Sequence, residues 1–317
     1  MTTQTVPASA PRISTRRRTP PLVRREARSF YAFASPWIAG FILFGGGPVV
    51  AALLLSFAHW SLLSPPSWAG LANYQRMFAD PLFYKSVLNT VYFAAGSVVL
   101  GVVTSFLLAI LLNQKVRGVG FFRTVFYLPS VVAGVATALL WVNILQPDYG
   151  LVNSVLRFFG IHGPGWLVDP NWAIPGLILM SVWGAGNTIV IYLAGLQGVS
   201  PALYEAARID GAGWWGRFWN VTVPMMSPVI FFNVVTSLIA SLQAYTLVLI
   251  MTGGGQPGTA GGPDNSTLML GLYIYREAFE YFDMGYAAAL SWAMFLLIGV
   301  ATGIQFLLAR RWVHYDA

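Results

Sequence analysis

Six long apolar stretches, none of which contains Asp, Glu, Lys or Arg, limit what this chain can fold into. They fall near residues 32–58, 87–112, 124–145, 172–197, 225–251 and 286–309. A helix of about 20 mostly apolar residues crosses a hydrocarbon core of roughly 30 Å, and a helix satisfies its own backbone hydrogen bonds in lipid. The sequence therefore predicts an all-α polytopic membrane protein with six transmembrane helices.

Composition excludes several other classes of protein. Charged residues make up 9% of the chain, whereas a soluble domain carries about 25%. Without cysteine the chain forms no disulfide and no thiolate metal site. The sequence also lacks a Walker motif, a cluster of metal ligands and a nucleophile–base pair. We therefore expect a non-catalytic chain that binds no cofactor or metal itself.

The distribution of polar residues divides the chain into four predicted segments. The first is rich in Arg, Pro, Ser and Thr and lacks the apolar run of a signal peptide. The segments are a disordered basic cytoplasmic tail over residues 1–29, a first span with an outer loop over 30–86, a transmembrane core over 87–310 that contains a long loop over 198–224, and a cytoplasmic tail over 311–317.

Basic residues indicate the orientation of these segments. If there are six spans, 14 of the 18 Lys and Arg residues lie on the side of the two termini. The opposite side keeps only Arg76, Lys85, Arg157 and Arg276. By the positive-inside rule, both termini of this multi-pass protein face the cytoplasm from the cytoplasmic (inner) membrane. The excess of basic residues on the cytoplasmic side then explains most of the net charge of +7, and these residues are attracted to the lipid bilayer. We therefore expect no nucleic-acid partner.

The long cytoplasmic loop carries signals for a short helix. Ser200 is a typical N-cap and Pro201 suits the first helical position. Asp210 and Gly211 end the helix, because Gly211 can take the left-handed conformation that follows a helix. Trp214 and neighbouring aromatic residues then form a second apolar patch before the fifth span, where Pro224 and Pro228 mark the entry.

One face of this predicted helix is small and apolar. Leu203, Ala206 and Ala207 lie at helical spacing, while Glu205 projects from another direction. Small residues allow another backbone to approach closely, which favours a docking element for a cytoplasmic partner. An interfacial helix lying on lipid fits the same pattern.

The outer loops contain two amphipathic stretches, 151–159 and 272–282. Each can lie in the membrane interface or form a platform for an external partner. The acidic residues of these loops are most simply solvated.

Polar residues inside the fourth and fifth spans are candidates for a solute pathway, although polar side chains also join helices to one another. In the fourth span Gly184 and Gly186 permit a kink or a close approach beside two of the candidates. In the fifth, Asn233, Thr236, Gln243 and Thr246 share one sector of a helical wheel, and Tyr245 lies nearby. The candidates are Trp183, Asn187, Asn233, Gln243, Tyr245 and Thr246.

The cytoplasmic loop resembles the EAA motif of binding-protein-dependent ABC import permeases. Glu205-Ala206-Ala207, then Asp210-Gly211-Ala212, Phe218 and Val223-Pro224 follow the order and spacing of that family, with Val223 in place of the usual Leu. Further matches to its carbohydrate branch occur at Gly70-Leu71-Ala72-Asn73-Tyr74, Asn89-Thr90, Leu128-Pro129, Gly150-Leu151-Val152-Asn153, Leu272-Tyr273-Ile274-Tyr275-Arg276, Ala278-Phe279 and Gly285-Tyr286-Ala287-Ala288-Ala289.

This resemblance implies the fold of a type I ABC importer permease that carries a sugar, an oligosaccharide or a related polyol or glycerol compound. It also implies a second homologous permease subunit, two ATPase subunits that use ATP-Mg, and an external solute-binding protein. The loop's helix would act as a coupling helix in a groove of the ATPase, and the fourth and fifth spans would line the sugar site. The implied coupling residues are Glu205, Ala206, Ala207, Asp210 and Gly211.

Three alternatives differ in what they require of the sequence. An ion-coupled secondary carrier of a neutral solute generally needs titratable groups inside the membrane, and no Asp or Glu lies in the six stretches. A membrane-embedded enzyme needs a catalytic constellation, which is missing. An importer for another class of solute stays open, although the uncharged spans favour a neutral one.

Overall fold

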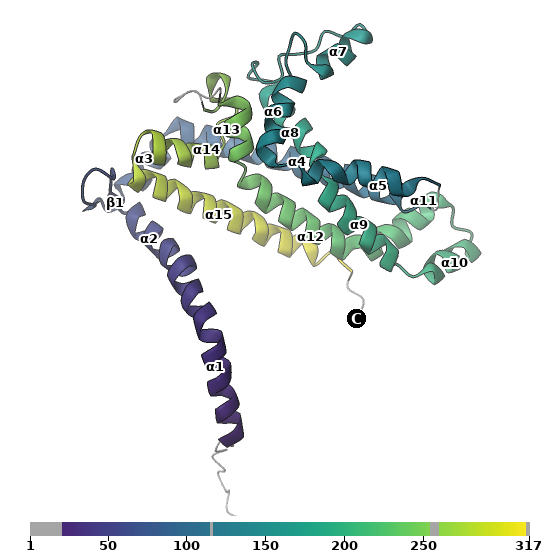
Figure 1. The fold of residues 1–317 in the computed structure, drawn as a ribbon, viewed down its shortest axis with the longest axis horizontal. Helices are drawn as coiled ribbons and strands as arrows, with labels where there is room; N and C mark the ends of the chain where they lie inside the picture. The colour runs from purple at the N-terminus through teal and green to yellow at the C-terminus, as the bar shows by residue number, and fades with distance from the viewer. Residues whose placement is uncertain (1–20, 115–116, 254–259, 315–317) are drawn as a thin grey trace, which may run out of the picture. The chain divides into compact units, whose positions relative to one another are not determined.

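The computed structural model describes residues 21–114, 117–253 and 260–314, which divide into one compact unit ending at Ala51 and a second beginning at Ala52 (Figure 1). Residues 1–20 of the predicted basic tail, Lys115, and residues 315–317 of the predicted C-terminal tail lie outside the described residues. The two units are described separately below.

The first unit is helical from its first described residue. It consists of α1 (Pro21–Phe41), the π-helical segment η1 (Ile42–Gly46) and the first half of α2 (Gly47–Ser56). Helix α1 begins nine residues before the predicted boundary at 30, because Pro21 suits a first helical position and residues 22–35 contain neither Pro nor Gly. The π-helical segment overlaps the Gly45–Gly47 run.

The second unit opens with a two-stranded hairpin and two helices. Strand β1 (Ala58–His59) pairs antiparallel with β2 (Ser67–Trp68), and α3 (Ala72–Ala79) leads into α4 (Pro81–Leu112). The start of α4 is strongly specified, because Pro81 occupies its first position and the Asp80 carboxylate accepts a 2.8 Å hydrogen bond from the amide of Leu82.

Two of the predicted spans are bent helix pairs. The third bends by 102° and the fourth by 49° between their two halves. Pro129 lies just before the first bend, and Gly184 lies in the second. The elements are α5 (Val119–Tyr127), the 3₁₀ segment η2 (Leu128–Val131), α6 (Gly134–Ile144), α7 (Leu151–Phe158), α8 (Ala173–Trp183) and α9 (Gly186–Gly198).

The predicted fifth span, 225–251, differs from the structure at both ends. A continuous helix runs over Trp214–Leu242, so it begins about ten residues earlier and ends nine residues earlier than predicted. The elements are α10 (Pro201–Ile209), α11 (Trp214–Arg217), the π-helical η3 (Phe218–Thr222), α12 (Val223–Leu242), α13 (Thr246–Thr252), the 3₁₀ segment η4 (Pro263–Asn265), α14 (Leu270–Tyr275), the π-helical η5 (Arg276–Glu280) and α15 (Met284–Ala309).

The early end of α12 coincides with a tertiary contact. Gly271 of α14 packs against the break, where an added Cβ would lie 3.4 Å from both the carbonyl oxygen of Ala244 and the Cβ of Tyr245. No proline or glycine marks this break in the sequence. In the part of the chain that the structure describes, four helices are long and apolar enough to cross a membrane, or up to six if each bent pair is one span.

Helix α4 connects the two hydrophobic clusters of the second unit (Figure 1). Its N-terminal half packs into a cluster with residues of α6, α8, α13, α14 and α15. Its C-terminal half contributes Phe106, Ala109 and Leu112 to a second cluster with α9 and the start of α12. The loop with α10 and α11 lies at the end of the unit where this second cluster forms.

Candidate functional site

The predicted coupling helix is α10, and its end has the geometry of a Schellman motif. Gly211 has a φ of +80°. Its amide donates to the carbonyl of Arg208 at 3.0 Å, and the amide of Ala212 donates to that of Ala207 at 2.8 Å. At the other end Pro201 occupies the first helical position as expected, but the Ser200 side chain forms no capping hydrogen bond, contrary to its predicted role.

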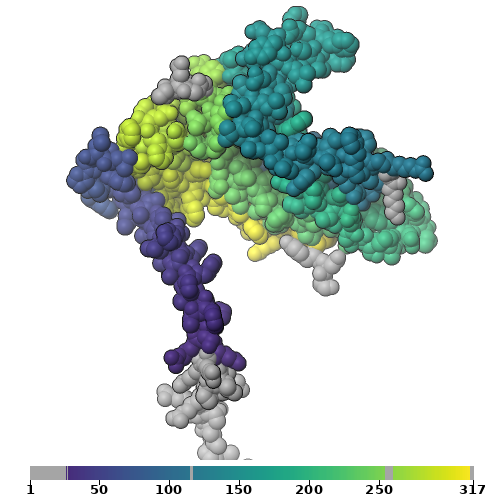
Figure 2. All heavy atoms as spheres, in the orientation of Figure 1, coloured from purple at the N-terminus to yellow at the C-terminus, as the bar shows by residue number. Residues whose placement is uncertain are grey.

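The predicted coupling residues lie on the surface of the second unit. Glu205, Ala206, Asp210 and Gly211 are exposed and Ala207 is half-buried. None of the residues of α10 or α11 is buried, and in the space-filling view this green segment forms one edge of the unit (Figure 2). The five residues are therefore accessible to a partner.

Aromatic residues attach the exposed loop to the helices behind it. The ring of Trp214 stacks on that of Phe218, with centroids 5.7 Å apart, and Phe218 lies 6.2 Å from Phe106 of α4. The hydroxyls of Tyr204 and Thr222 are 3.2 Å apart and link α10 to the start of α12. These contacts link α10 and α11 to α4 and to the start of α12.

The second half of the loop is continuous with a span. Helix α11 passes through the π-helical η3 into α12, so Trp214–Leu242 is one helix in which Pro224 and Pro228 are internal. These prolines do not mark the start of the helix, because Pro224 lies in the first turn of α12, just after the π-helical turn η3, and Pro228 lies inside α12. The loop is thereby continuous with a helix that is long and apolar enough to cross a membrane.

Most of the predicted pathway residues lie at breaks between helices. Trp183 ends α8 and is 50% exposed, with its ring 6.0 Å from that of Trp141. Asn187 is exposed in the first turn of α9. Trp183 and Asn187 therefore lie on the two sides of the break between α8 and α9.

The fifth-span candidates do not share one helical face. Gln243 and Tyr245 lie in the break between α12 and α13, and Thr246 begins α13, so the helical-wheel sector predicted from sequence does not exist. Gln243 and Thr246 are exposed and Tyr245 is half-buried. Asn233 is only 2% exposed and donates a 2.9 Å hydrogen bond to the carbonyl of Val229 within its own helix.

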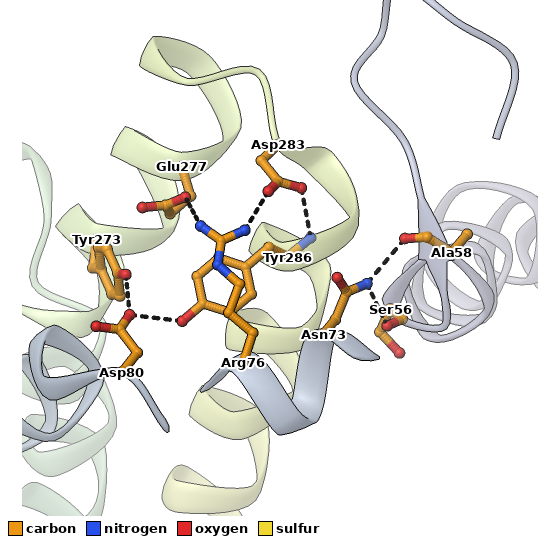
Figure 3. A network of polar contacts seen from close by, with 9 residues as sticks. All are labelled: Ser56, Ala58, Asn73, Arg76, Asp80, Tyr273, Glu277, Asp283 and Tyr286. Carbon is orange, nitrogen blue, oxygen red and sulfur yellow. Dashed lines mark hydrogen bonds and ion pairs between the residues drawn. The ribbon is translucent and has the colours of Figure 1, made fainter. Parts of the chain in front are cut away.

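Sequence reasoning missed a polar network at the opposite end of α4 (Figure 3). The guanidinium of Arg76 in α3 lies 2.5 Å from the Asp283 carboxylate and 3.3 Å from that of Glu277. Its Cζ also lies 3.9 Å above the centroid of the Tyr286 ring. These acids were expected to be solvated, but Glu277 is 4% exposed because the 272–282 stretch packs against the unit.

Asp80 extends the same network. The hydroxyl of Tyr286 donates to its carboxylate at 2.8 Å, and that of Tyr273 donates to the same oxygen (Figure 3). Burial by itself raises the pKa of Asp80, but these hydrogen bonds and the one from the Leu82 amide bring the pKa below its usual value. Burial raises the pKa of Glu277 above its ordinary value, although the charge of Arg76 opposes that shift.

The neighbouring Asn73 anchors the hairpin that follows α2. Its side-chain amide donates to the carbonyls of Ser56 at 3.0 Å and Ala58 at 2.9 Å (Figure 3). Asn73, Arg76 and Asp80 lie at helical spacing in the sequence, which is the one local signal that could have grouped them.

Comparison with known proteins gives consistent matches over the chain. Residues 101–314 match the model of the family described as "Binding-protein-dependent transport system inner membrane component". The probable ABC transporter permease protein YesP of Bacillus subtilis is 39% identical over 93% of this chain and 94% of its own. The lactose transport system permease protein LacF of Rhizobium radiobacter is 38% identical over 89% and 94%.

A solved structure has a similar fold. One chain of a bacterial alginate ABC transporter, crystallised in complex with an alginate pentasaccharide-bound periplasmic protein, superposes with a TM-score of 0.78. The sequences are 25% identical, and the match covers 93% of this chain and 99% of that chain.

Proposed function

Since this chain belongs to the family of binding-protein-dependent transport system inner membrane components, we propose that it is the permease subunit of an ATP-driven importer for a carbohydrate. Its fold is the type I ABC importer permease fold. We choose a carbohydrate as the solute class because the chain is similar, over almost its full length, to a lactose permease subunit and to a chain of an alginate importer.

The partners follow from this assignment. A second homologous permease subunit would complete the pathway, two ATPase subunits would hydrolyse ATP-Mg on the cytoplasmic side, and an external binding protein would deliver the solute. This chain would supply no catalytic residue. Both termini would face the cytoplasm, as the distribution of basic residues indicates.

The coupling role is assigned to α10. Glu205, Ala206, Ala207, Asp210 and Gly211 would contact the ATPase, and three features support this assignment: their exposure, the defined end of α10 at Gly211, and the continuous helix from Trp214 to Leu242. A rigid connection is needed, because ATP-driven closure must bias one orientation of the spans over the other.

The solute pathway is assigned to the helix breaks. Trp183 would supply an aromatic face, and Asn187, Gln243, Tyr245 and Thr246 would supply hydrogen-bonding groups. Asn233 is retained as a candidate that would have to leave its present hydrogen bond to Val229. The absence of charged residues from all six stretches favours a neutral solute such as the sugar named for the lactose permease subunit, although alginate is an acidic polysaccharide.

Affinity purification of the tagged chain from its native membrane tests this proposal. We expect a Walker-motif ATPase and a second, related permease to co-purify, with ATPase activity in the preparation. Reconstituted with the binding protein, the complex should take up radiolabelled carbohydrate only when ATP is present inside the vesicles. A folded chain that purifies alone, with uptake driven by a proton or sodium gradient, would contradict the importer and favour a secondary carrier.

A further inference from the structure

A cleft of about 390 Å³ lies where the C-terminal end of α4 meets the loop with α10 and α11. Asn113 and Gln114 line it from the end of α4, and Arg208 and Arg217 line it from the loop. Small-ligand pockets have volumes of roughly 300–1,000 Å³, so this cleft can hold a small polar group. A ligand in it would contact both the loop and α4.

The two arginines that line this cleft lack protein partners. Within the described residues, neither guanidinium forms a hydrogen bond or an ion pair, and the Nε atom of Arg217 is buried without an acceptor. A buried N–H group without an acceptor is unfavourable, so the cleft favours a ligand that supplies acceptor atoms.

The rest of the lining adds donors and no negative charge. The described lining residues include no Asp or Glu, while the side-chain amides of Asn113 and Gln114 provide further N–H groups. Two planar guanidinium groups can each donate a pair of hydrogen bonds to the oxygens of a phosphate. A single carboxylate has too few oxygens to accept from all of these N–H groups. The charge and the number of donors therefore match a phosphate group.

We propose that this cleft binds a phosphate-bearing anion, either the head group of an anionic phospholipid or a soluble phosphate compound. The ligand bridges Arg208 and Arg217 of the loop to the end of α4. Binding of this anion requires only the residues of the cleft. Any effect of the bound anion on coupling to an ATPase rests on the proposed function of α10. A bound anion would restrain α10 relative to α4 and so alter coupling.

Titration of the purified complex in phosphatidylcholine nanodiscs tests the site. The probes are dioctanoyl phosphatidylglycerol, glycerol 1-phosphate and inorganic phosphate, with binding measured by native mass spectrometry and calorimetry. We expect saturable binding of at least one probe and a loss of affinity of about tenfold or more in R208Q/R217Q. The single variant R208Q should lose affinity as well, and because Arg208 is exposed its replacement should not impair folding. R310Q is the matched control, because Arg310 is exposed at the end of α15 and distant in sequence from the cleft.

The probes distinguish the two sources of phosphate. Tighter binding of the lipid than of both soluble compounds would identify a head-group site, and equal binding would identify a soluble ligand. Equal affinity in R208Q and R310Q, or no saturable binding by the wild-type complex, would overturn the proposal. ATP-driven uptake is measured separately, so failure of uptake in every protein would contradict the importer assignment and leave the binding result standing.

Discussion

The Asp80 carboxylate joins three helices, because it caps α4 and accepts hydrogen bonds from Tyr273 of α14 and Tyr286 of α15. Its pKa in the folded protein lies below its ordinary value of 3.8. The unfolded chain therefore binds more protons at acidic pH, and the stability that this carboxylate provides is present above pH 3.8 and lost as the pH falls through the folded pKa.

Replacement of this carboxylate by an amide should weaken the contact of α4 with α14 and α15. We expect Asp80→Asn to lower the free energy of unfolding at pH 7 by about 1–3 kcal/mol, because hydrogen bonds to a charged acceptor are lost. The acid-dependent loss of stability seen in the wild type should also become smaller. Thermal unfolding of the detergent-solubilised protein at pH 7 and at acidic pH measures both effects.

The matched control is Asp148→Asn, since Asp148 is an exposed acid between α6 and α7. It should leave the unfolding midpoint unchanged at both pH values. If the two variants unfold alike, the carboxylate of Asp80 is solvated in the protein and its network does not contribute to stability.

Helix α10 depends on one backbone conformation at its end. Gly211 has a φ of +80°, and a Cβ added there would have no atom within 4 Å, so backbone conformation and not space restricts this position. We expect Gly211→Val to insert and fold but to lose most ATP-driven uptake, because a β-branched residue disfavours this conformation and the turn reorients α10. Uptake in proteoliposomes and ATPase activity measure the effect.

Two further variants separate conformation from size. Gly211→Asn should retain most uptake, because Asn tolerates the left-handed region. Gly213→Val should also retain it, since Gly213 has an ordinary φ of −65° and open space around it. Wild-type uptake in Gly211→Val would sink the coupling role assigned to this turn.

The contact between α5 and α9 depends on a glycine for a different reason. A Cβ on Gly186 would lie 2.9 Å from the carbonyl oxygen of Phe126, so a larger residue must push the two helices apart. We expect Gly186→Val to lower the free energy of unfolding by about 1–3 kcal/mol. Gly120→Val in α5 meets no atom within 4 Å and should cost much less; similar thermal midpoints for the two variants would contradict the close packing.

These elements explain what the sequence could and could not predict. Pro201 and Gly211 are local signals, so α10 and its end were predictable, whereas the coupling role of the residues between them stays a prediction. The end of α12 at Leu242 was not, because packing of Gly271 in a distant helix accompanies the break. The ion pair of Arg76 with Asp283 joins residues 207 positions apart, a separation at which composition and periodicity carry no signal. The pathway candidates of the fifth span were chosen on one helical wheel, and that wheel fails where α12 ends at Leu242.

At the scale of the whole molecule, the two bent pairs decide the topology. Each is either one broken span or a re-entrant loop that returns to the same side. If both cross, the chain has six spans and its termini share a side. If one crosses, the chain has five spans and its termini lie on opposite sides. If neither crosses, the termini again share a side, but the segment between the pairs, which contains His162, lies with them.

Single-cysteine labelling distinguishes these three topologies, because the natural chain has no cysteine to interfere. We expect His162→Cys to react with a membrane-impermeant maleimide in intact spheroplasts, and Ser14→Cys and Arg310→Cys to react only after permeabilisation. Reaction of Arg310→Cys but not Ser14→Cys in intact spheroplasts would mean that one bent pair is re-entrant. Protection of all three positions would make both pairs re-entrant and would place the 151–159 stretch in the cytoplasm, where an external binding protein cannot reach it. The expected pattern requires both bent pairs to cross the bilayer, which places α10 on the same side as the termini and in reach of a cytoplasmic ATPase.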